Sequence, residues 1–206
     1  MKTLIFDLDG TIANTKNTAI DIIFELTQKY KYNYSKNEIK DILENKNFNE
    51  IIKDFKISKI KLAYIIWKGK KELKKRIKDI KPIKGIKVTL EKLSKNNRII
   101  LLTSNNKNNS EKFLKNNELQ DLFTSKYYNA SLLSKDIILK KVIKIQQLNP
   151  NLTYYIGDET RDIVASKKAG IKSISVTWGY NSKELLKKFN PNYIVEKPEE
   201  ILKIIL

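Results

Sequence analysis

Short apolar runs alternate with helical patterns along the second half of the chain, and this alternation restricts the possible folds more than any other feature. The run Ile99–Leu102 is continuously apolar, which is typical of a parallel strand covered on both faces. Further strands are expected near Tyr127 and over residues 152–156, 171–177 and 193–195, and helices over residues 86–93, 110–116, 138–145 and 160–169 and at the C-terminus. Strands that alternate with helices in this way predict a parallel sheet with helices on its faces.

The N-terminal part contains one more strand and then a long helical section. Leu4–Phe6 is a short apolar run that ends in an Asp/Gly turn, as expected of a buried strand. From about residue 17 to residue 80, apolar residues recur only at helical spacing. We therefore predict an α/β fold, a Rossmann-like doubly wound parallel sheet formed by residues 1–15 and 83–206. An all-helical insertion over residues 16–82 interrupts it, and we expect Tyr64 and Trp67 in the interior of that insertion.

The composition excludes several kinds of chemistry. The chain has no Cys and no His, which excludes disulfides, thiol nucleophiles and imidazole acid/base catalysis. No apolar run approaches the ~18 residues that a membrane-spanning helix needs, so we expect no membrane partner. Asp7 and Asp9 lie where a signal peptide would be apolar, and we therefore expect a cytoplasmic protein.

The net charge of +18 at pH 7 would attract a polyanion such as a nucleic acid. The excess is mostly Lys, however, and it is spread along the whole chain among abundant Asn and Ile, residues that share A/T-rich codons. Nucleic-acid-binding arms are usually dense basic blocks. We therefore do not expect specific nucleic-acid binding, and the sequence leaves the choice between a monomer and a dimer open.

Polar residues follow three of the expected strands. Asp7 and Asp9 come after the first, Thr103–Asn105 after the second, and Gly157–Asp162 after a later one. The carboxyl ends of parallel strands meet at one edge, where open sheets bind their ligands. Carboxylates gathered there repel one another unless a cation holds them, and Mg²⁺ prefers oxygen ligands of this kind. The Ser104 hydroxyl, near the expected start of a helix, suits a phosphate anion. A metal ion, a phosphate site and a carboxylate nucleophile together predict phosphoryl transfer through an aspartyl-phosphate.

These motifs resemble the four motifs of the haloacid dehalogenase superfamily of phosphohydrolases. They are Asp7–Thr11 after an apolar strand, Thr103–Asn105 after another, a Lys upstream of a later strand, and Gly157–Asp162. The likeness extends over the whole chain and is greatest to the phosphoglycolate-phosphatase-like branch. That branch carries a helical cap after the first motif, where the helical insertion lies here.

The resemblance implies a role for each motif residue. Asp7 would attack phosphorus, and Asp9 would protonate the leaving oxygen and then activate water. The implied Mg²⁺ ligands are Asp7, the Asp9 carbonyl and Asp158, with Asp162 supporting the metal or its waters. The implied phosphate-binding residues are Gly10, Thr11, Ser104, Asn105 and Lys135.

The choice of Lys rests on spacing. In the family this Lys lies a little over twenty residues before the Gly-Asp motif, and Lys135 matches that spacing. Asp136 follows it where relatives often have Pro. The nearby lysines Lys126, Lys140 and Lys141 remain alternatives.

We therefore predict a Mg²⁺-dependent phosphatase of small phosphorylated metabolites, with phosphoglycolate as the first substrate to test. A phosphomutase or an inorganic pyrophosphatase on the same fold is an alternative. A basic nucleic-acid-binding protein with a vestigial site is an alternative from another class.

Overall fold

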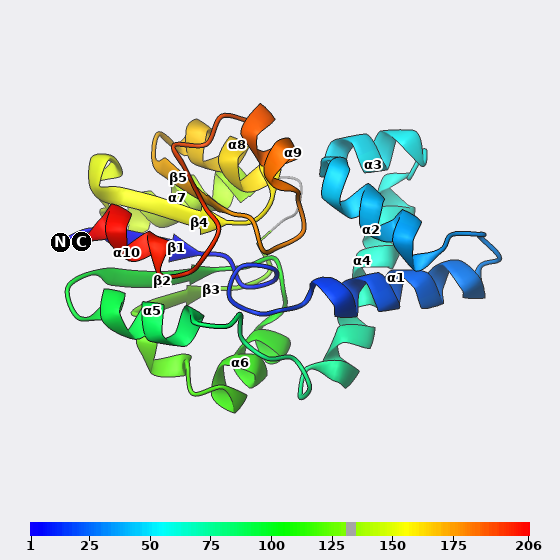
Figure 1. Cartoon of the computed structure of the whole chain (residues 1–206), viewed down its shortest axis with the longest axis horizontal. Helices are drawn as coiled ribbons and strands as arrows, with labels where there is room; N and C mark the ends of the chain where they lie inside the picture. Colours follow the sequence, from blue (N-terminus) through cyan, green and yellow to red (C-terminus); the bar gives the residue numbers. More distant parts are fainter. Residues whose placement is uncertain (131–134) are drawn as a thin grey trace.

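A six-stranded parallel sheet forms the centre of the protein in the computed structural model, which describes residues 1–130 and 135–206 (Figure 1). The strand order is β3-β2-β1-β4-β5-β6, and every neighbouring pair is parallel. The strands are β1 (Thr3–Phe6), β2 (Arg98–Leu102), β3 (Ser125–Tyr127), β4 (Thr153–Gly157), β5 (Lys172–Val176) and β6 (Tyr193–Val195). The predicted α/β fold with a doubly wound parallel sheet is confirmed.

Helices connect the strands of the sheet. Four further helices come directly after β1 in the chain. The helices of the α/β part are α5 (Ile86–Ser94), α6 (Lys107–Asn116), α7 (Lys135–Ile145), α8 (Thr160–Ala169), α9 (Lys183–Lys188) and α10 (Glu200–Ile205). The helices between β1 and α5 are α1 (Lys16–Lys29), α2 (Lys36–Asn45), α3 (Phe48–Asp54) and α4 (Lys59–Arg76). Among the described residues, no helix is both long enough and apolar enough to cross a lipid bilayer.

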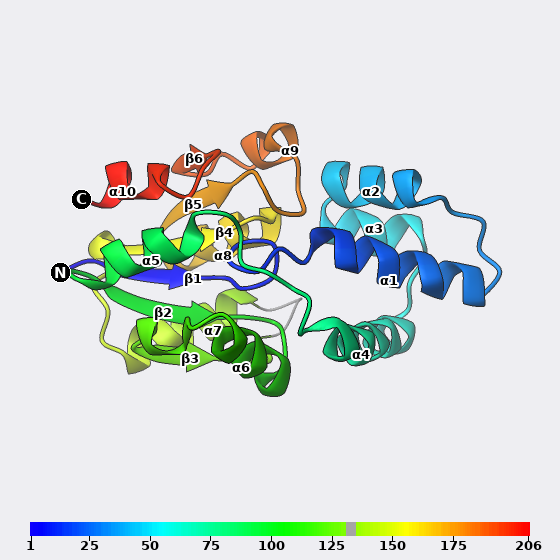
Figure 2. The same ribbon diagram turned by 60° about the horizontal axis from the view of Figure 1, so that its bottom comes forward.

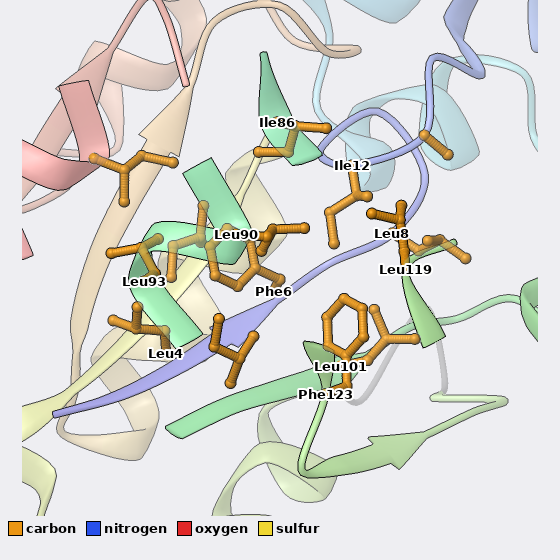
Figure 3. Packing of buried hydrophobic residues seen from close by; sticks show 14 of the residues in the cluster. Leu4, Phe6, Leu8, Ile12, Ile86, Leu90, Leu93, Leu101, Leu119 and Phe123 are labelled. Carbon is orange, nitrogen blue, oxygen red and sulfur yellow. The ribbon is translucent and has the colours of Figure 1, made fainter. Parts of the chain in front are cut away.

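The alternation of side chains along β1 divides the core into two layers. Leu4 and Phe6 point to the face covered by α5, and Leu90 of that helix packs in the same cluster (Figure 3). Ile5 points to the opposite face, where it joins Leu139 of α7 and Ala165 of α8. Successive residues of a strand face opposite sides, so a continuous apolar run is needed to bury both layers.

The two chain crossings between the sheet and helices α1–α4 lie side by side. Ala13 forms an isolated antiparallel bridge with Pro82. The amide of Asn14 donates to the Lys81 carbonyl at 3.0 Å, and the amide of Ile83 donates to the Ile12 carbonyl at 2.8 Å. Helices α1–α4 lie beyond the ends to which the strands point, while both chain termini lie at the other end (Figure 2).

Two features of the fold differ from the sequence prediction. Tyr64 and Trp67 are 45% and 55% exposed, so the prediction that they lie in the interior was wrong. With 3.6 residues per turn, they occupy the side of α4 roughly opposite the buried Leu62. Helix α9 was not predicted; it begins after Ser182, whose hydroxyl accepts from the Leu185 amide at 3.2 Å.

Leu90 and Val88 of α5 provide a matched test of the core. Leu90 is fully buried, whereas Val88 is 53% exposed. We expect Leu90→Ala to lower the free energy of unfolding by about 2–5 kcal/mol, because it removes apolar contacts and leaves a cavity. Val88→Ala should change it by less than about 0.5 kcal/mol. Urea unfolding monitored by circular dichroism measures both, and equal losses in the two variants would contradict the proposed packing.

Candidate active site

The carboxyl ends of the strands point toward α1–α4 (Figure 2), and residues from distant parts of the sequence follow them. Asp7 follows β1, Asn105 follows β2 and Asp158 follows β4. The Asn105 amide nitrogen lies 3.1 Å from an Asp9 carboxylate oxygen, although 96 residues separate the two in the chain. The fold therefore gathers the polar residues of the predicted motifs at one edge of the sheet.

Lys135 links two buried carboxylates. Its Nζ donates to Asp7 Oδ2 at 2.7 Å and to Asp162 Oδ1 at 2.5 Å, and all three side chains are almost completely buried. The other oxygen of Asp7 accepts from the Leu8 amide at 2.8 Å, and Asp162 Oδ2 accepts from the Glu159 amide at 3.1 Å. These contacts hold each carboxylate in one orientation.

The alternative lysines lie in other surroundings. Lys126 is 3.8 Å from the Glu111 carboxylate. Lys140 and Lys141 are exposed on α7. Of these four lysines, Lys135 is the one in contact with Asp7.

Asp158 is held by two donors from different loops. Its Oδ1 accepts from the Thr11 hydroxyl at 2.8 Å, and its Oδ2 accepts from the Tyr180 amide at 2.8 Å. The side chain is completely buried. Thr11 lies after β1 and Tyr180 after β5, so the position of Asp158 depends on strand ends on both sides of β4.

Three glycines leave room for these carboxylates. A Cβ on Gly10 or Gly179 would lie 2.2 Å from an Asp158 carboxylate oxygen, and one on Gly157 would lie 2.2 Å from an Asp162 oxygen. Such distances are far shorter than any ordinary contact. Gly10 also has a φ of +79°, which side-chain-bearing residues rarely adopt.

The carboxylate cluster is electrostatically unbalanced. Ligand oxygens of Asp7, Asp158 and Asp162 all lie within 4.8 Å of one another, and all three residues are buried. Burial, followed by the neighbouring carboxylates Glu159, Asp162 and Asp7, raises the pKa of Asp158 well above its ordinary value. Burial also raises the pKa of Asp7 despite the opposing charge of Lys135. An all-oxygen set of this kind can bind a divalent cation, which would supply the missing positive charge.

Asp9 lies beside this cluster in a separate environment. Burial and the charge of Asp7 raise the pKa of Asp9 to about 7, although the hydrogen bond from Asn105 opposes the change. A carboxyl group with such a pKa exchanges a proton near neutral pH, which is the property that general acid/base catalysis requires.

The residues predicted to bind phosphate differ in whether their donors are already used. The Gly10 amide donates to the Ala13 carbonyl at 2.9 Å, and the Thr11 hydroxyl donates to Asp158. The Asn105 side chain bonds to Asp9, Asn106 and Asn109. In contrast, the buried Ser104 hydroxyl has no hydrogen-bond partner among the described residues. A buried hydroxyl without a partner suits a ligand oxygen.

The loop after β5 follows the strand predicted over residues 171–177, so the sequence predicts it at this edge as a packed aromatic segment, with Arg161 as a local ion-pairing or cap-facing residue. Gly179 and Tyr180 contact Asp158, and the Asn181 side chain accepts from the Thr160 amide at 2.8 Å. Arg161 forms an ion pair with Glu159. No local signal in the sequence predicts the contact of this loop with Asp158.

The chain matches one protein family over most of its length. Residues 4–176 match the family described as haloacid dehalogenase-like hydrolase. Over 206 residues the chain is 25% identical to a phosphoglycolate phosphatase of Synechococcus elongatus, covering 100% of this chain and 97% of that protein. Over 216 residues it is 27% identical to pyrophosphatase PpaX of Oceanobacillus iheyensis, again covering 100% of this chain and 97% of that protein.

Solved structures share the fold. A haloacid dehalogenase-like family hydrolase from Streptococcus pneumoniae superimposes with a TM-score of 0.82 at 22% identity, covering 100% of this chain and 99% of that one. A structure described as a predicted phosphatase from Clostridium acetobutylicum superimposes with a TM-score of 0.85 at 21% identity, covering 99% of this chain and 97% of that one. The arrangement of the sheet and helices is therefore one that solved proteins adopt.

Gly179→Ala tests the close approach of the β5 loop to Asp158. The new methyl group would overlap the Asp158 side chain, so we expect the free energy of unfolding to fall by about 1–3 kcal/mol. Gly69→Ala is the control, because nothing lies within 4 Å of its Cβ position on α4. The control should instead gain roughly 0.5–1 kcal/mol from helix propensity. Urea denaturation measures the free energy of unfolding of both variants. A Gly179→Ala variant as stable as the wild type would show that the loop after β5 leaves room for a methyl group beside Asp158.

Proposed function

The chain belongs to the haloacid dehalogenase-like hydrolases, and from this premise we propose that it is a Mg²⁺-dependent phosphatase that hydrolyses small phosphomonoesters. The observation that carries this proposal is the buried cluster of Asp7, Asp158 and Asp162 at the strand ends, with Lys135 paired to Asp7 and Asp162. The relatives named phosphoglycolate phosphatase support a phosphorylated small molecule as substrate. Phosphoglycolate is therefore the first substrate to test.

The acidic residues fit a divalent cation. Asp7 and Asp158, together with the Asp9 carbonyl, would hold Mg²⁺, and Asp162 would support it. Their pKa values are consistent with this role, because burial and like charges make the ionised forms of Asp7 and Asp158 costly without a further cation. When bound, the ion would neutralise charge on the transferring phosphoryl group.

Asp7 is the proposed nucleophile. A carboxylate oxygen of Asp7 forms a bond to phosphorus while the bond from phosphorus to the ester oxygen breaks. In the second half-reaction, a water oxygen attacks phosphorus and the bond to Asp7 breaks, which releases inorganic phosphate. The hydrogen bond from Leu8 holds the carboxylate in one orientation, which favours attack by a defined oxygen.

Asp9 is the proposed general acid and base. It donates its proton to the leaving oxygen in the first half-reaction and accepts a proton from the attacking water in the second. A pKa of about 7 supports both directions of transfer, because both protonation states are populated near neutral pH.

Lys135 and Ser104 are the proposed contacts for the phosphoryl oxygens. Lys135 is already beside Asp7, and burial by itself would lower the pKa of Lys135, but Asp162 and Asp7 raise it, so the group stays positively charged. The Ser104 hydroxyl, which has no partner within the part of the chain that the structure describes, supplies a donor in the loop after β2. We further propose that residues 16–82 form a cap that limits access to small substrates.

Inorganic pyrophosphatase activity is the second candidate. It is favoured by the full-length likeness to proteins named pyrophosphatase PpaX, of which the Oceanobacillus iheyensis protein is 27% identical. Pyrophosphate presents the same phosphoryl group with a phosphate as its leaving group. A panel that contains phosphoglycolate, pyrophosphate and sugar phosphates therefore compares both candidates and also tests phosphomutase activity.

Asp7→Asn tests the nucleophile. We expect the rate of phosphate release to fall by at least about 10³-fold, because the amide cannot form the phosphorylated intermediate. Asp121→Asn, at an exposed position in the short helix Gln120–Leu122, should keep the wild-type rate. The measurement is a colorimetric phosphate assay with Mg²⁺. Near-normal turnover by Asp7→Asn would refute the proposed role.

Magnesium binding has a readout that does not depend on activity. We expect Mg²⁺ to raise the thermal midpoint of the wild type, since a ligand at about 100 times its Kd stabilises the folded state by about 2.7 kcal/mol. Asp158→Asn should abolish this shift because it removes a ligand and a buried charge, while Asp121→Asn should retain it. Differential scanning calorimetry with and without EDTA measures these shifts. An equal shift in Asp158→Asn would place the metal elsewhere.

A further inference from the structure

Arg161 lies beside the site and has a donor group that the protein does not use. Its Nε donates to Glu159 Oε2 at 2.7 Å, and its Nη2 contacts the same oxygen. Its Nη1 is buried and has no hydrogen-bond partner among the described residues. Since Nε and Nη2 form one edge of the planar guanidinium, Glu159 occupies that edge and leaves Nη1 unpaired within the described part of the chain.

The guanidinium borders a hollow between helices α1–α4 and the α/β part. The hollow has a volume of about 130 Å³, and its lining includes Asn47, Phe48, Lys135 and Arg161. The Phe48 ring, at the start of α3, lies 5.7 Å from the Arg161 guanidinium carbon. Lys135 borders this hollow and also contacts Asp7, so one residue lies between the hollow and the proposed phosphoryl site.

The positive charge of Arg161 acts on the reacting carboxylates. Burial raises the pKa values of Asp7 and Asp9, and the guanidinium lowers both. Burial by itself would lower the pKa of Arg161, but Glu159, Asp162 and Asp7 raise it, so the group is permanently charged. Arg161 is therefore near enough to interact electrostatically with a substrate bound at Asp7.

We propose that Arg161 binds a second anionic group of the substrate. The preferred substrates are then phosphomonoesters, or phosphoanhydrides, whose leaving group carries a carboxylate or phosphate near the bridging oxygen. This inference rests on the proposed function and specifies the substrate class of the same site. The free end of a guanidinium presents N–H donors that match the planar oxygens of a carboxylate or the oxygens of a phosphate.

The other two cations at the hollow are less suited to this role. Lys135 is already paired with Asp7 and Asp162. The Lys168 side chain is 58% exposed and lies 3.4 Å from Asp136. An exposed, mobile ammonium gains little from an anion because water screens the charge. Arg161 is oriented by the ion pair with Glu159, and its guanidinium carbon lies over the Phe48 ring, so less side-chain entropy is lost when it binds.

The test compares phosphoglycolate with 2-hydroxyethyl phosphate, which has a neutral hydroxymethyl group in place of the carboxylate. We expect Arg161→Gln to lower kcat/KM for phosphoglycolate by about ten- to hundredfold, the usual range for a lost hydrogen bond to a charged group. The value for 2-hydroxyethyl phosphate should stay within about threefold of the wild type. Pyrophosphate, tested in parallel, shows whether a second phosphate is recognised in place of a carboxylate.

Two further variants separate binding from structure. Glu159→Gln/Arg161→Gln removes the ion pair as a unit, so no unpaired Glu159 charge remains, and it should show the same selective loss. Lys168→Met is the matched control and should leave the ratio of the two substrates unchanged.

An equal loss on charged and neutral substrates in both Arg161 variants would overturn the proposal and assign Arg161 a structural role. A wild type that does not prefer the anionic substrates would also overturn it. A wild type that releases no phosphate from any substrate with Mg²⁺ would instead refute the proposed function, so the two failures are distinguishable.

Discussion

The burial of three neighbouring carboxylates, two of them paired with one lysine, is the interaction on which the rest of the site depends. Asp7, Asp158 and Asp162 carry three negative charges in a region shielded from water, and Lys135 supplies one positive charge. Such an arrangement costs stability unless further positive charge enters, because desolvation and like-charge repulsion both oppose ionisation. A divalent cation would offset the two negative charges that Lys135 leaves unbalanced, so the cluster suits such an ion.

Apolar burial in the sheet offsets the free-energy cost of burying this carboxylate cluster. Strand β1 is buried on both faces, and its register with β2 and β4 places the residues after the three strands at the same level. Gly157 and Gly179 let neighbouring backbone approach the carboxylates without steric overlap. Apolar packing on both faces of the sheet thus compensates for polar groups concentrated at one edge.

The helical insertion completes the surroundings of the site. Its two connections to the sheet lie side by side, and further contacts come from α2, where the Leu43 carbonyl accepts from the Asn181 side chain at 2.9 Å. Asn181 also accepts from the amide at the start of α8, directly after Asp158. One side chain therefore connects the insertion to the loop that carries the carboxylates. The domain division itself stays a prediction.

Local patterns were enough to predict the sheet, most helices and the family. Apolar runs reveal buried strands, and the turns that follow them carry the acidic motifs, so the edge at which Asp7 and Asp158 would meet followed from parallel topology alone. The roles of the individual site residues stay predictions. Tyr64 and Trp67 were misplaced because periodicity shows that a helix has an apolar side but not which aromatic residues lie outside it.

The sequence by itself therefore determined the α/β architecture, the helical insertion after β1 and the acidic residues available for chemistry, because these depend on local periodicity and spacing. Only the tertiary structure decided that Lys135, which spacing favoured without excluding Lys126, Lys140 and Lys141, is the one of these lysines that contacts Asp7. It also decided how the loop after β5 holds Asp158, and that Arg161 Nη1 has no partner among the described residues. Those features depend on contacts between residues far apart in the chain, which local patterns do not determine.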